Sequence, residues 1–153
     1  MKKTVSRRQF VKTGAAAAAT FAMVDPFNRV LGANDEIRVG VVGFRGRGKS
    51  HIEGFSNQPG VRLAALCDVD LDVLEQGVEK YSKPGQKLKT YSDYRRLIED
   101  NDIDLISIAT PNHTHSLISV EAILAGKDVY VEKPVSHNVW EGQIGRASCR
   151  ERV

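Results

Sequence analysis

A lysine at the end of an apolar run is the side chain best suited to chemistry in this sequence. Lys133 follows the run Val129–Val131 and precedes Pro134. A residue before proline favours an extended backbone, and open α/β sheets bind ligands at the carboxyl ends of their strands. The amine is therefore predicted to project towards a ligand. In a chain that opens with a dinucleotide-binding pattern, such a lysine suggests a redox enzyme. The alternative is a surface lysine that closes a strand, because lysines are mostly exposed.

A glycine-rich turn offers a place for a dinucleotide. Gly43 can make the tight turn, Gly46 lets the backbone approach a pyrophosphate, and Gly48 lets helix and strand pack closely. Arg45 occupies the middle glycine position of the G-x-G-x-x-G pattern. Arg45 or Arg47 could supply positive charge, and a helix amino terminus adds free N–H groups. The alternative is a glycine-rich connection without a ligand.

An aspartate follows at the spacing expected of a ribose-binding carboxylate. Asp68 lies 25 residues after Gly43, close to the spacing in dinucleotide-binding folds. Its carboxylate can accept both adenosine ribose hydroxyls and would repel the extra phosphate of NADP, so NAD is favoured as cofactor. Either Asp68 or Asp70 can instead cap the next helix. Asp70 suits the cap better because it directly precedes that helix.

The elements that must position these residues alternate between strand and helix patterns. An apolar run predicts a buried parallel strand at 37–42, and further strands are predicted at 62–67, 88–91, 105–109 and 129–131. Helical patterns lie at 49–57, 70–81, 93–100 and 113–124. Right-handed crossovers then give an α/β fold with a doubly wound parallel sheet of the Rossmann type. The predicted dinucleotide-binding domain covers residues 34–143.

The charge of the chain is concentrated at its ends. The net charge is +3, but residues 1–33 carry six Lys/Arg against one acid and residues 144–153 carry three Arg against one acid. The ends contribute +5 and +2, which leaves the body near −4. Residues 34–143 thus carry a net negative charge and lack the basic patch that binds nucleic acid, so no nucleic-acid partner is expected.

Residues 1–33 are predicted to be a twin-arginine signal and linker. The run Ser6-Arg7-Arg8-Gln9-Phe10-Val11-Lys12 precedes a weakly apolar, alanine-rich segment, as in export signals. That segment is too short to span a bilayer, so stable membrane insertion is not expected. The twin-arginine export machinery is the expected partner, and the location is periplasmic or extracytoplasmic. A basic amphipathic helix or a disordered tail is the alternative.

Residues 144–153 look foreign to the domain. They interrupt a helical pattern that begins at Ser136, and they back-translate to a sequence resembling a sequencing-library adapter. We therefore interpret them as an adapter-derived tail, an origin that a genuine stop codon after Val153 in genomic DNA would exclude. Cys149 lies in this tail, so Cys67 has no credible disulfide partner.

The four histidines are predicted not to form a metal site. They show no ligand cluster with recognised spacing. His51, His113 and His137 are interpreted as helix-surface or capping residues.

The motifs together resemble the amino-terminal domain of the glucose-fructose oxidoreductase and inositol dehydrogenase (Gfo/Idh/MocA) family. The resemblance covers about residues 37–142 and rests on the glycine turn together with Cys67-Asp68-Val69-Asp70, Tyr91-Ser92-Asp93-Tyr94-Arg95, Ile108-Ala109-Thr110-Pro111-Asn112-His113-Thr114-His115, the run Ala125–Val131 and Glu132-Lys133-Pro134. It implies that Thr110, Asn112 and His115 line the cofactor cleft. It also implies that Glu132 lies near the nicotinamide ribose and that Lys133 polarises or deprotonates the reacting hydroxyl.

The resemblance implies an NAD(P)-dependent oxidoreductase acting on a sugar, cyclitol or related polyol. It places substrate binding and oligomerisation in a second α/β domain that this chain lacks. The last strand of the dinucleotide-binding domain is also absent, so that domain is expected to be incomplete at its carboxyl end. The fragment is then inactive alone, and the full-length protein is a homo-oligomer. One alternative is a family branch that cleaves glycosides with NAD, whose members generally lack the lysine at position 133. Another is a non-catalytic nucleotide- or sugar-binding protein.

Overall fold

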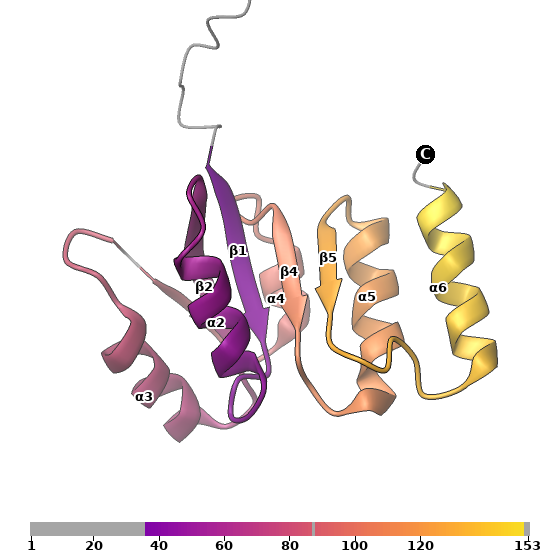
Figure 1. Ribbon diagram of the computed structural model, residues 1–153, viewed down its shortest axis with the longest axis horizontal. Coiled ribbons are helices and arrows are strands. Elements are labelled where there is room, and N and C mark those ends of the chain that lie inside the picture. Colours follow the sequence, from indigo (N-terminus) through magenta and orange to yellow (C-terminus); the bar gives the residue numbers. More distant parts are fainter. Residues whose placement is uncertain (1–35, 87, 152–153) are drawn as a thin grey trace, which may run out of the picture. The chain divides into compact units, whose positions relative to one another are not determined.

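The centre of the protein is a parallel sheet. The structure, a computed structural model, describes residues 36–86 and 88–151. Five strands follow the order β3-β2-β1-β4-β5 (Figure 1). They are β1 (Ile37–Val42), β2 (Val61–Cys67), β3 (Lys89–Tyr91), β4 (Leu105–Ile108) and β5 (Asp128–Val131). The predicted doubly wound parallel sheet is confirmed, whereas the predicted signal at 1–33 lies outside the described residues.

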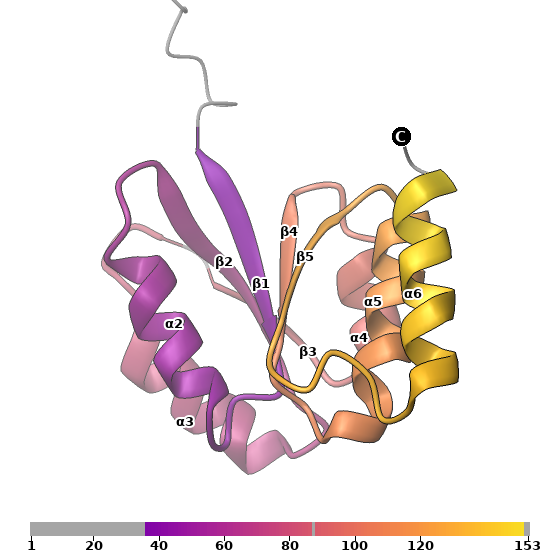
Figure 2. The ribbon, with the colours of Figure 1, turned by 45° about the vertical axis from the view of Figure 1, so that its right-hand side comes forward.

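Helices cover both faces of the sheet. On one face lie α2 (Gly48–Ser56) and α3 (Leu71–Tyr81), and on the other lie α4 (Tyr94–Ile98) and α5 (His115–Leu124) (Figure 2). Helix α6 (Val139–Glu151) packs beside α5, which follows the short 3-10 turn η1 (Asn112–Thr114). No helix within the described ranges is long and apolar enough to cross a membrane.

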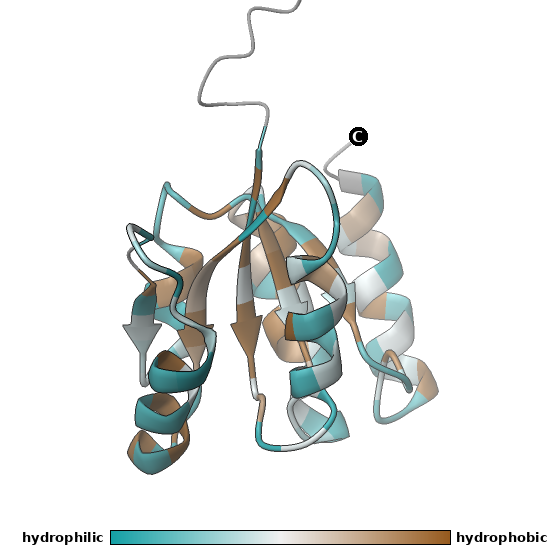
Figure 3. Ribbon diagram, turned by 60° about the vertical axis from the view of Figure 1, so that its left-hand side comes forward, coloured by the Kyte–Doolittle hydropathy of each residue, from teal (hydrophilic) through white to brown (hydrophobic). Residues whose placement is uncertain are grey.

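Each face of the sheet carries its own apolar core. The core under α2 and α3 contains Val39, Val41, Phe44, Ile52, Leu63, Leu66 and Leu74. The core under α4 and α5 contains Val42, Ala64, Ala65, Cys67, Leu97, Ile98, Ile103, Ile106, Ile108, Ile118 and Ala122. Strands buried on both faces are apolar along their whole length, and Figure 3 shows hydrophobic residues on the strands and hydrophilic ones on outer helix faces.

Side chains and a tight turn fix where the helices begin. Asp70 caps α3 by accepting hydrogen bonds from the backbone N–H groups of Asp72 and Val73, so it is the cap that its position predicts. The single helix predicted at 113–124 instead divides into η1 and α5. Thr114 donates both its backbone N–H and its hydroxyl to the carbonyl of Pro111, which closes a tight turn before the longer helix.

The carboxyl-terminal helix differs from its prediction. The expected break at Ile144 is wrong, because α6 continues to Glu151 and the Ser148 hydroxyl donates to the carbonyl of Ile144 at 3.2 Å. Alanine, arginine and glutamate in this segment are good helix formers, so the sequence supports a helix whatever its origin. The adapter origin of residues 144–153 stays a prediction.

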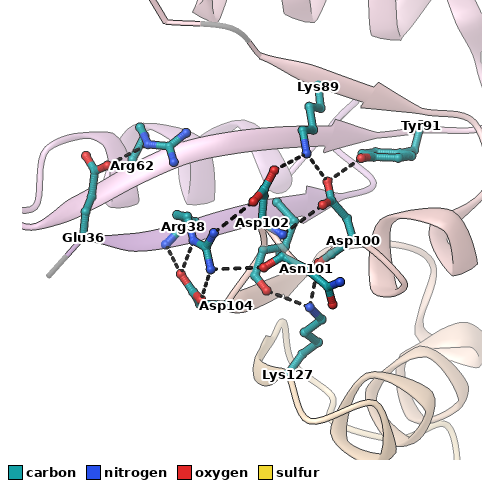
Figure 4. A network of polar contacts seen from close by, with 11 residues as sticks. Glu36, Arg38, Arg62, Lys89, Tyr91, Asp100, Asn101, Asp102, Asp104 and Lys127 are labelled. Carbon is teal, nitrogen blue, oxygen red and sulfur yellow. Dashed lines mark hydrogen bonds and ion pairs between the residues drawn. The ribbon is translucent and has the colours of Figure 1, made fainter. Parts of the chain in front are cut away.

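A network of charges holds the amino-terminal ends of the strands together (Figure 4). Arg38 at the start of β1 forms a two-pronged contact with Asp104 before β4, with its Nη2 atom 2.7 Å from Oδ1 and its Nε atom 2.8 Å from Oδ2. Lys127, before β5, donates to the carbonyls of Asp100 and Ile103 at 2.7 and 2.8 Å. The network therefore joins three strands at the edge opposite their carboxyl ends.

Among the acids of this network, Asp100 has the most strongly shifted pKa. Burial alone would raise its pKa, but hydrogen bonds from the Lys89 amine at 2.7 Å and the Tyr91 hydroxyl at 2.6 Å outweigh that effect and lower its pKa to about 2. A depressed pKa means that the folded state favours the carboxylate. Asp100 therefore stabilises the fold above its ordinary pKa near 3.8 and loses that contribution as the pH falls towards 2.

We predict that Asp100→Asn lowers the free energy of unfolding at pH 7 by about 1–2 kcal/mol. The stability of the Asp100→Asn variant should also fall less steeply than that of the wild type between pH 4 and pH 2. This window is set by the ordinary and the shifted pKa of Asp100. Urea unfolding at several pH values measures both effects. The control is Asp102→Asn, a more exposed acid of the same network. Equal pH slopes for wild type and Asp100→Asn would contradict this role.

Candidate functional site

The sheet register brings the predicted site residues to one edge. Val42 pairs with both Cys67 and Ile108, and Ile108 pairs with Val131. The next residue of each strand therefore lies at the same carboxyl edge: these are Gly43, Asp68, Ala109 and Glu132. The predicted turn, ribose carboxylate, Thr110 loop and Glu132-Lys133 segment thus line one edge, where ligands bind in such sheets.

The glycine turn leaves no room for side chains at two positions. Gly43 has φ +76°, a left-handed conformation that favours glycine. A Cβ atom on Gly48 would lie 2.2 Å from the Gly43 carbonyl oxygen, so α2 begins directly against the end of β1. The backbone N–H groups of residues 45–47 have no hydrogen-bond partner within the described part of the chain. They are available to an anion at the start of α2.

Asp68 braces the turn from the neighbouring strand. Its Oδ2 atom accepts a hydrogen bond from the Phe44 backbone N–H at 3.2 Å, and its Oδ1 atom accepts one from the Asp70 N–H at 3.1 Å. A carboxylate has about four acceptor sites, so Asp68 retains capacity for hydroxyl donors. Arg45 forms an ion pair with Asp70, which places its charge beside the predicted ribose site.

A cleft of about 510 Å³ opens beside these residues. It is lined by Val42, Gly43, Cys67, Asp68, Val69, Ser92, Asp93, Tyr94, Arg95, Thr110, Pro111, Thr114 and Ile118. The structure thus brings three predicted cofactor residues, Gly43, Asp68 and Thr110, to one cavity. The other predicted residues are not part of this lining.

His115 connects two loops of the site. Its Nε2 atom lies 2.7 Å from the Thr110 carbonyl oxygen, and its Nδ1 atom lies 2.7 Å from the Pro134 carbonyl oxygen. The residue is only 2% exposed. The ring therefore ties the loop after β4 to the segment that carries Lys133, whereas Asn112 lies exposed in η1.

Glu132 and Lys133 differ in their surroundings. The Glu132 carboxylate contacts His51 Nε2 at 2.8 Å and Arg47 Nε at 3.5 Å. The hydrogen bond from His51, helped by the charge of Arg47, outweighs desolvation and lowers the pKa of Glu132. The Lys133 side chain is exposed and has no hydrogen bond or ion pair with the residues that the structure describes, while the Lys133 backbone N–H contributes a hydrogen bond to the Glu132 carboxylate. Its amine is therefore available to a ligand.

Sequence reasoning missed His51. It was interpreted as a surface or capping residue, but its side chain is 5% exposed and contacts Glu132 and Ser107. The interpretation was wrong because the helix α2 turns this position towards the sheet, on the same face as the buried Ile52. The apolar pattern of that helix was the only available signal. Within the described ranges, no three His, Cys, Asp or Glu side chains form a metal-binding group.

The geometry fits a dinucleotide. The tight Gly43–Gly48 contact leaves backbone amides open to phosphate, Asp68 can accept ribose hydroxyls, and the cleft lies between them and the Thr110 loop. These groups belong to three segments that the sheet register aligns. The exposed amine of Lys133 lies on a fourth segment at the same edge.

Comparisons with known proteins agree with this geometry. The profile of an oxidoreductase family with an NAD-binding Rossmann fold matches residues 37–152. The myo-inositol 2-dehydrogenase structure from Lactobacillus plantarum superimposes with a TM-score of 0.69 and 27% identity, over 76% of this chain and 34% of that one.

Two curated relatives are named as glycosidases and not as dehydrogenases. The glycosyl hydrolase family 109 protein 2 of Shewanella sp. (strain ANA-3) is 38% identical over 112 residues, or 70% of this chain and 25% of the relative. The alpha-N-acetylgalactosaminidase of Shewanella oneidensis is 32% identical over 164 aligned positions, or 90% of this chain and 35% of the relative. This chain thus spans about a quarter to a third of their length. Because the profile matches most of the chain, the protein belongs to the Gfo/Idh/MocA oxidoreductase family, and residues 37–152 match its NAD-binding Rossmann domain.

Proposed function

We propose that the full-length protein transfers hydride between an NAD(P) cofactor and a carbinol carbon of a sugar, cyclitol or related polyol. One observation carries this proposal: the register aligns the glycine turn, Asp68, the Thr110 loop and Lys133 at one edge, beside a cleft of about 510 Å³. Family membership supports the cofactor class. Substrate binding and homo-oligomer formation would be supplied by a second domain.

Each residue at this edge has a defined task. The amides after Gly43 would bind the pyrophosphate, and Asp68 would accept the adenosine ribose hydroxyls. Glu132 would lie near the nicotinamide ribose, with Thr110, Asn112 and His115 shaping the loop on the other side. When bound, the nicotinamide supplies the acceptor for a hydride.

Lys133 would handle the proton of the reaction. As the C–H bond of the carbinol breaks, its electron pair leaves with the hydride and the carbon becomes a carbonyl. In the same step the Lys133 amine would either take up the hydroxyl proton or polarise the O–H bond by a hydrogen bond as that proton leaves. An exposed amine without an internal partner can turn towards the substrate, whereas a lysine held in a salt bridge could not do so freely.

We predict that Lys133→Met lowers kcat on the order of 10²-fold or more, as expected for a positioned acid/base group. Cofactor affinity should change little, because Lys133 has no contact that supports the turn. Steady-state kinetics and cofactor titration of the full-length protein measure the two effects. Lys83→Met, an exposed lysine after α3, is the control. Undiminished turnover in Lys133→Met would remove the residue from the mechanism.

The cofactor is proposed to be NAD in preference to NADP. The Asp68 carboxylate would lie beside the adenosine ribose and would repel a 2′-phosphate. Arg45, which could attract that phosphate, is paired with Asp70. The charge balance at this corner of the cleft therefore favours a ribose with free hydroxyls.

We predict that Asp68→Ser weakens NAD binding about tenfold or more, because hydrogen bonds to a charged group are worth roughly 1.5–3 kcal/mol. NADP should bind as well as NAD, or better. Titration of the full-length protein with each cofactor tests this. Asp72→Ser removes a nearby exposed charge and serves as control. Equal wild-type affinities for the two cofactors would count against the role of Asp68.

Glycoside cleavage is the second candidate function. Its support is the similarity to the two Shewanella relatives, at 38% and 32% identity. In that reaction the sugar is oxidised transiently and the hydride returns, so no reduced cofactor accumulates. Lys133 favours a net oxidoreductase. Full-length protein given free polyols and a nitrophenyl glycoside separates the two, by NADH accumulation in the first case and nitrophenol release in the second.

We also propose that the protein is exported through the twin-arginine route to the periplasm. The supporting feature is the Ser6–Lys12 run with its paired arginines. Arg7→Lys together with Arg8→Lys should leave folded, cofactor-binding protein in the cytoplasm, because only the address is lost. Cell fractionation measures this, with Lys2→Arg and Lys3→Arg as a control pair. Unchanged export of the arginine variant would contradict the proposal.

A further inference from the structure

A buried polar chain runs from the interior of the sheet to the edge that carries Lys133. His51 on α2 lies with its Nδ1 atom 2.9 Å from the Ser107 hydroxyl on β4 and its Nε2 atom 2.8 Å from the Glu132 carboxylate after β5. Ser107 is fully buried. We call these three residues the Glu132 network. It joins one helix and two strands beneath the site.

Several contacts fix the geometry of this network. The Tyr130 ring packs edge-on against the His51 ring, with centroids 5.2 Å apart. The backbone N–H of Glu132 donates to the Ile108 carbonyl at 2.9 Å. Both the main chain and the carboxylate of Glu132 are therefore held in place. Lys133 directly follows Glu132, and its exposed amine has no partner in the described part of the chain.

The hydrogen bonds of the network are compatible with two protonation states of the His51 ring. A neutral His51 ring can donate from Nε2 to the carboxylate while Nδ1 accepts from the Ser107 hydroxyl. A doubly protonated ring can donate from both nitrogens, because the Ser107 oxygen also accepts hydrogen bonds. The network therefore keeps both contacts in either state of the ring, which a carbonyl in place of Ser107 would not allow.

Packing alone does not explain His51. Its ring packs against Tyr130, whose ring also packs against Phe55, and burying an imidazole beside aromatic rings costs free energy unless its nitrogens are hydrogen-bonded. Phenylalanine would fill this space without that cost. The contacts of the ring lead to a carboxylate at the site edge, so its specific effect falls on Glu132.

We propose that His51, supported by Ser107, is a positioning residue for hydride transfer: it fixes the orientation of the Glu132 carboxylate beside Lys133. This inference rests on the proposed function and deepens it. His51 does not line the cleft described above, and its side chain is almost fully buried. His51 acts through Glu132 and not on the substrate.

The charges around Glu132 give this proposal a measurable signature. The groups that face its carboxylate are His51 from α2 and Arg47 from the glycine turn, with Lys133 next to it in the chain and the neutral Ser107 behind His51. The His51 hydrogen bond is the largest influence that lowers the pKa of Glu132. Without it, Glu132 takes up a proton at higher pH. The part of the acidic limb of the rate profile that reflects protonation of Glu132 should then move to higher pH.

The test compares His51→Phe, His51→Gln and Ser107→Ala in the full-length protein. His51→Phe should lower kcat about tenfold to a hundredfold, the range expected when a reacting group is misplaced, and move the acidic limb of kcat upwards in pH. His51→Gln keeps a donor towards Glu132 and should recover part of both. Ser107→Ala should have the smaller effect. NAD affinity should change less than threefold in all three.

His113→Phe is the matched control, because His113 is an exposed histidine in η1. A purely structural role for His51 would lower the melting temperature without moving the acidic limb. Wild-type rate and an unmoved limb in a folded His51→Phe protein overturn the inference. If His51→Phe does not fold, His51→Gln and Ser107→Ala decide the matter by the same two readouts.

A second readout separates this inference from the proposed function. Carbon-13 NMR titration of the Glu132 carboxyl in the present chain, assigned with Glu132→Gln, needs no activity. The midpoint should rise in His51→Phe and stay unchanged in His113→Phe. Absence of hydride transfer in the wild-type full-length protein defeats the proposed function, whereas an unmoved Glu132 midpoint in His51→Phe defeats the network.

Discussion

The parallel pairing of β1 with both β2 and β4 decides where the loops of the site leave the sheet. Because Val42 pairs with Cys67 on one side and Ile108 on the other, three loops must leave the sheet side by side. The chain turns in opposite directions from this central strand, which opens a crevice there. The cleft, the glycine turn and the Thr110 loop are consequences of that one register.

The two edges of the sheet have different chemistry. At the amino edge, Arg38, Lys89 and Lys127 are all engaged by carboxylates or carbonyls, so the charges there hold strands together. At the carboxyl edge, Lys133 is exposed and the amides of residues 45–47 have no partner in the described part of the chain. Unused hydrogen-bonding capacity is thus concentrated where a ligand would bind.

Local sequence signals predicted the fold well because each is decided within a few residues. Strand patterns marked all five strands, and Asp70 marked the start of α3. The split between η1 and α5 could not be predicted, since it depends on two hydrogen bonds from Thr114 to one carbonyl. The continuation of α6 past Ile144 likewise contradicted the expected break.

The site was predictable to the extent that it follows motifs. Gly43, Asp68 and Thr110 meet at the cleft because the strands that precede them are paired. The partners of His51 could not be predicted, because Ser107 and Glu132 are 56 and 81 residues away and meet it only through the fold. The same holds for His115, whose two carbonyl partners come from different loops.

We propose that this edge of the sheet supports hydride transfer from a carbinol. Deuterium tracing can follow that hydride, with full-length protein, NAD and polyols or sugars deuterated at each carbinol carbon in turn. Deuterium from one carbon should appear at C4 of the nicotinamide. No transfer from any position, in protein shown to hold NAD, would contradict it.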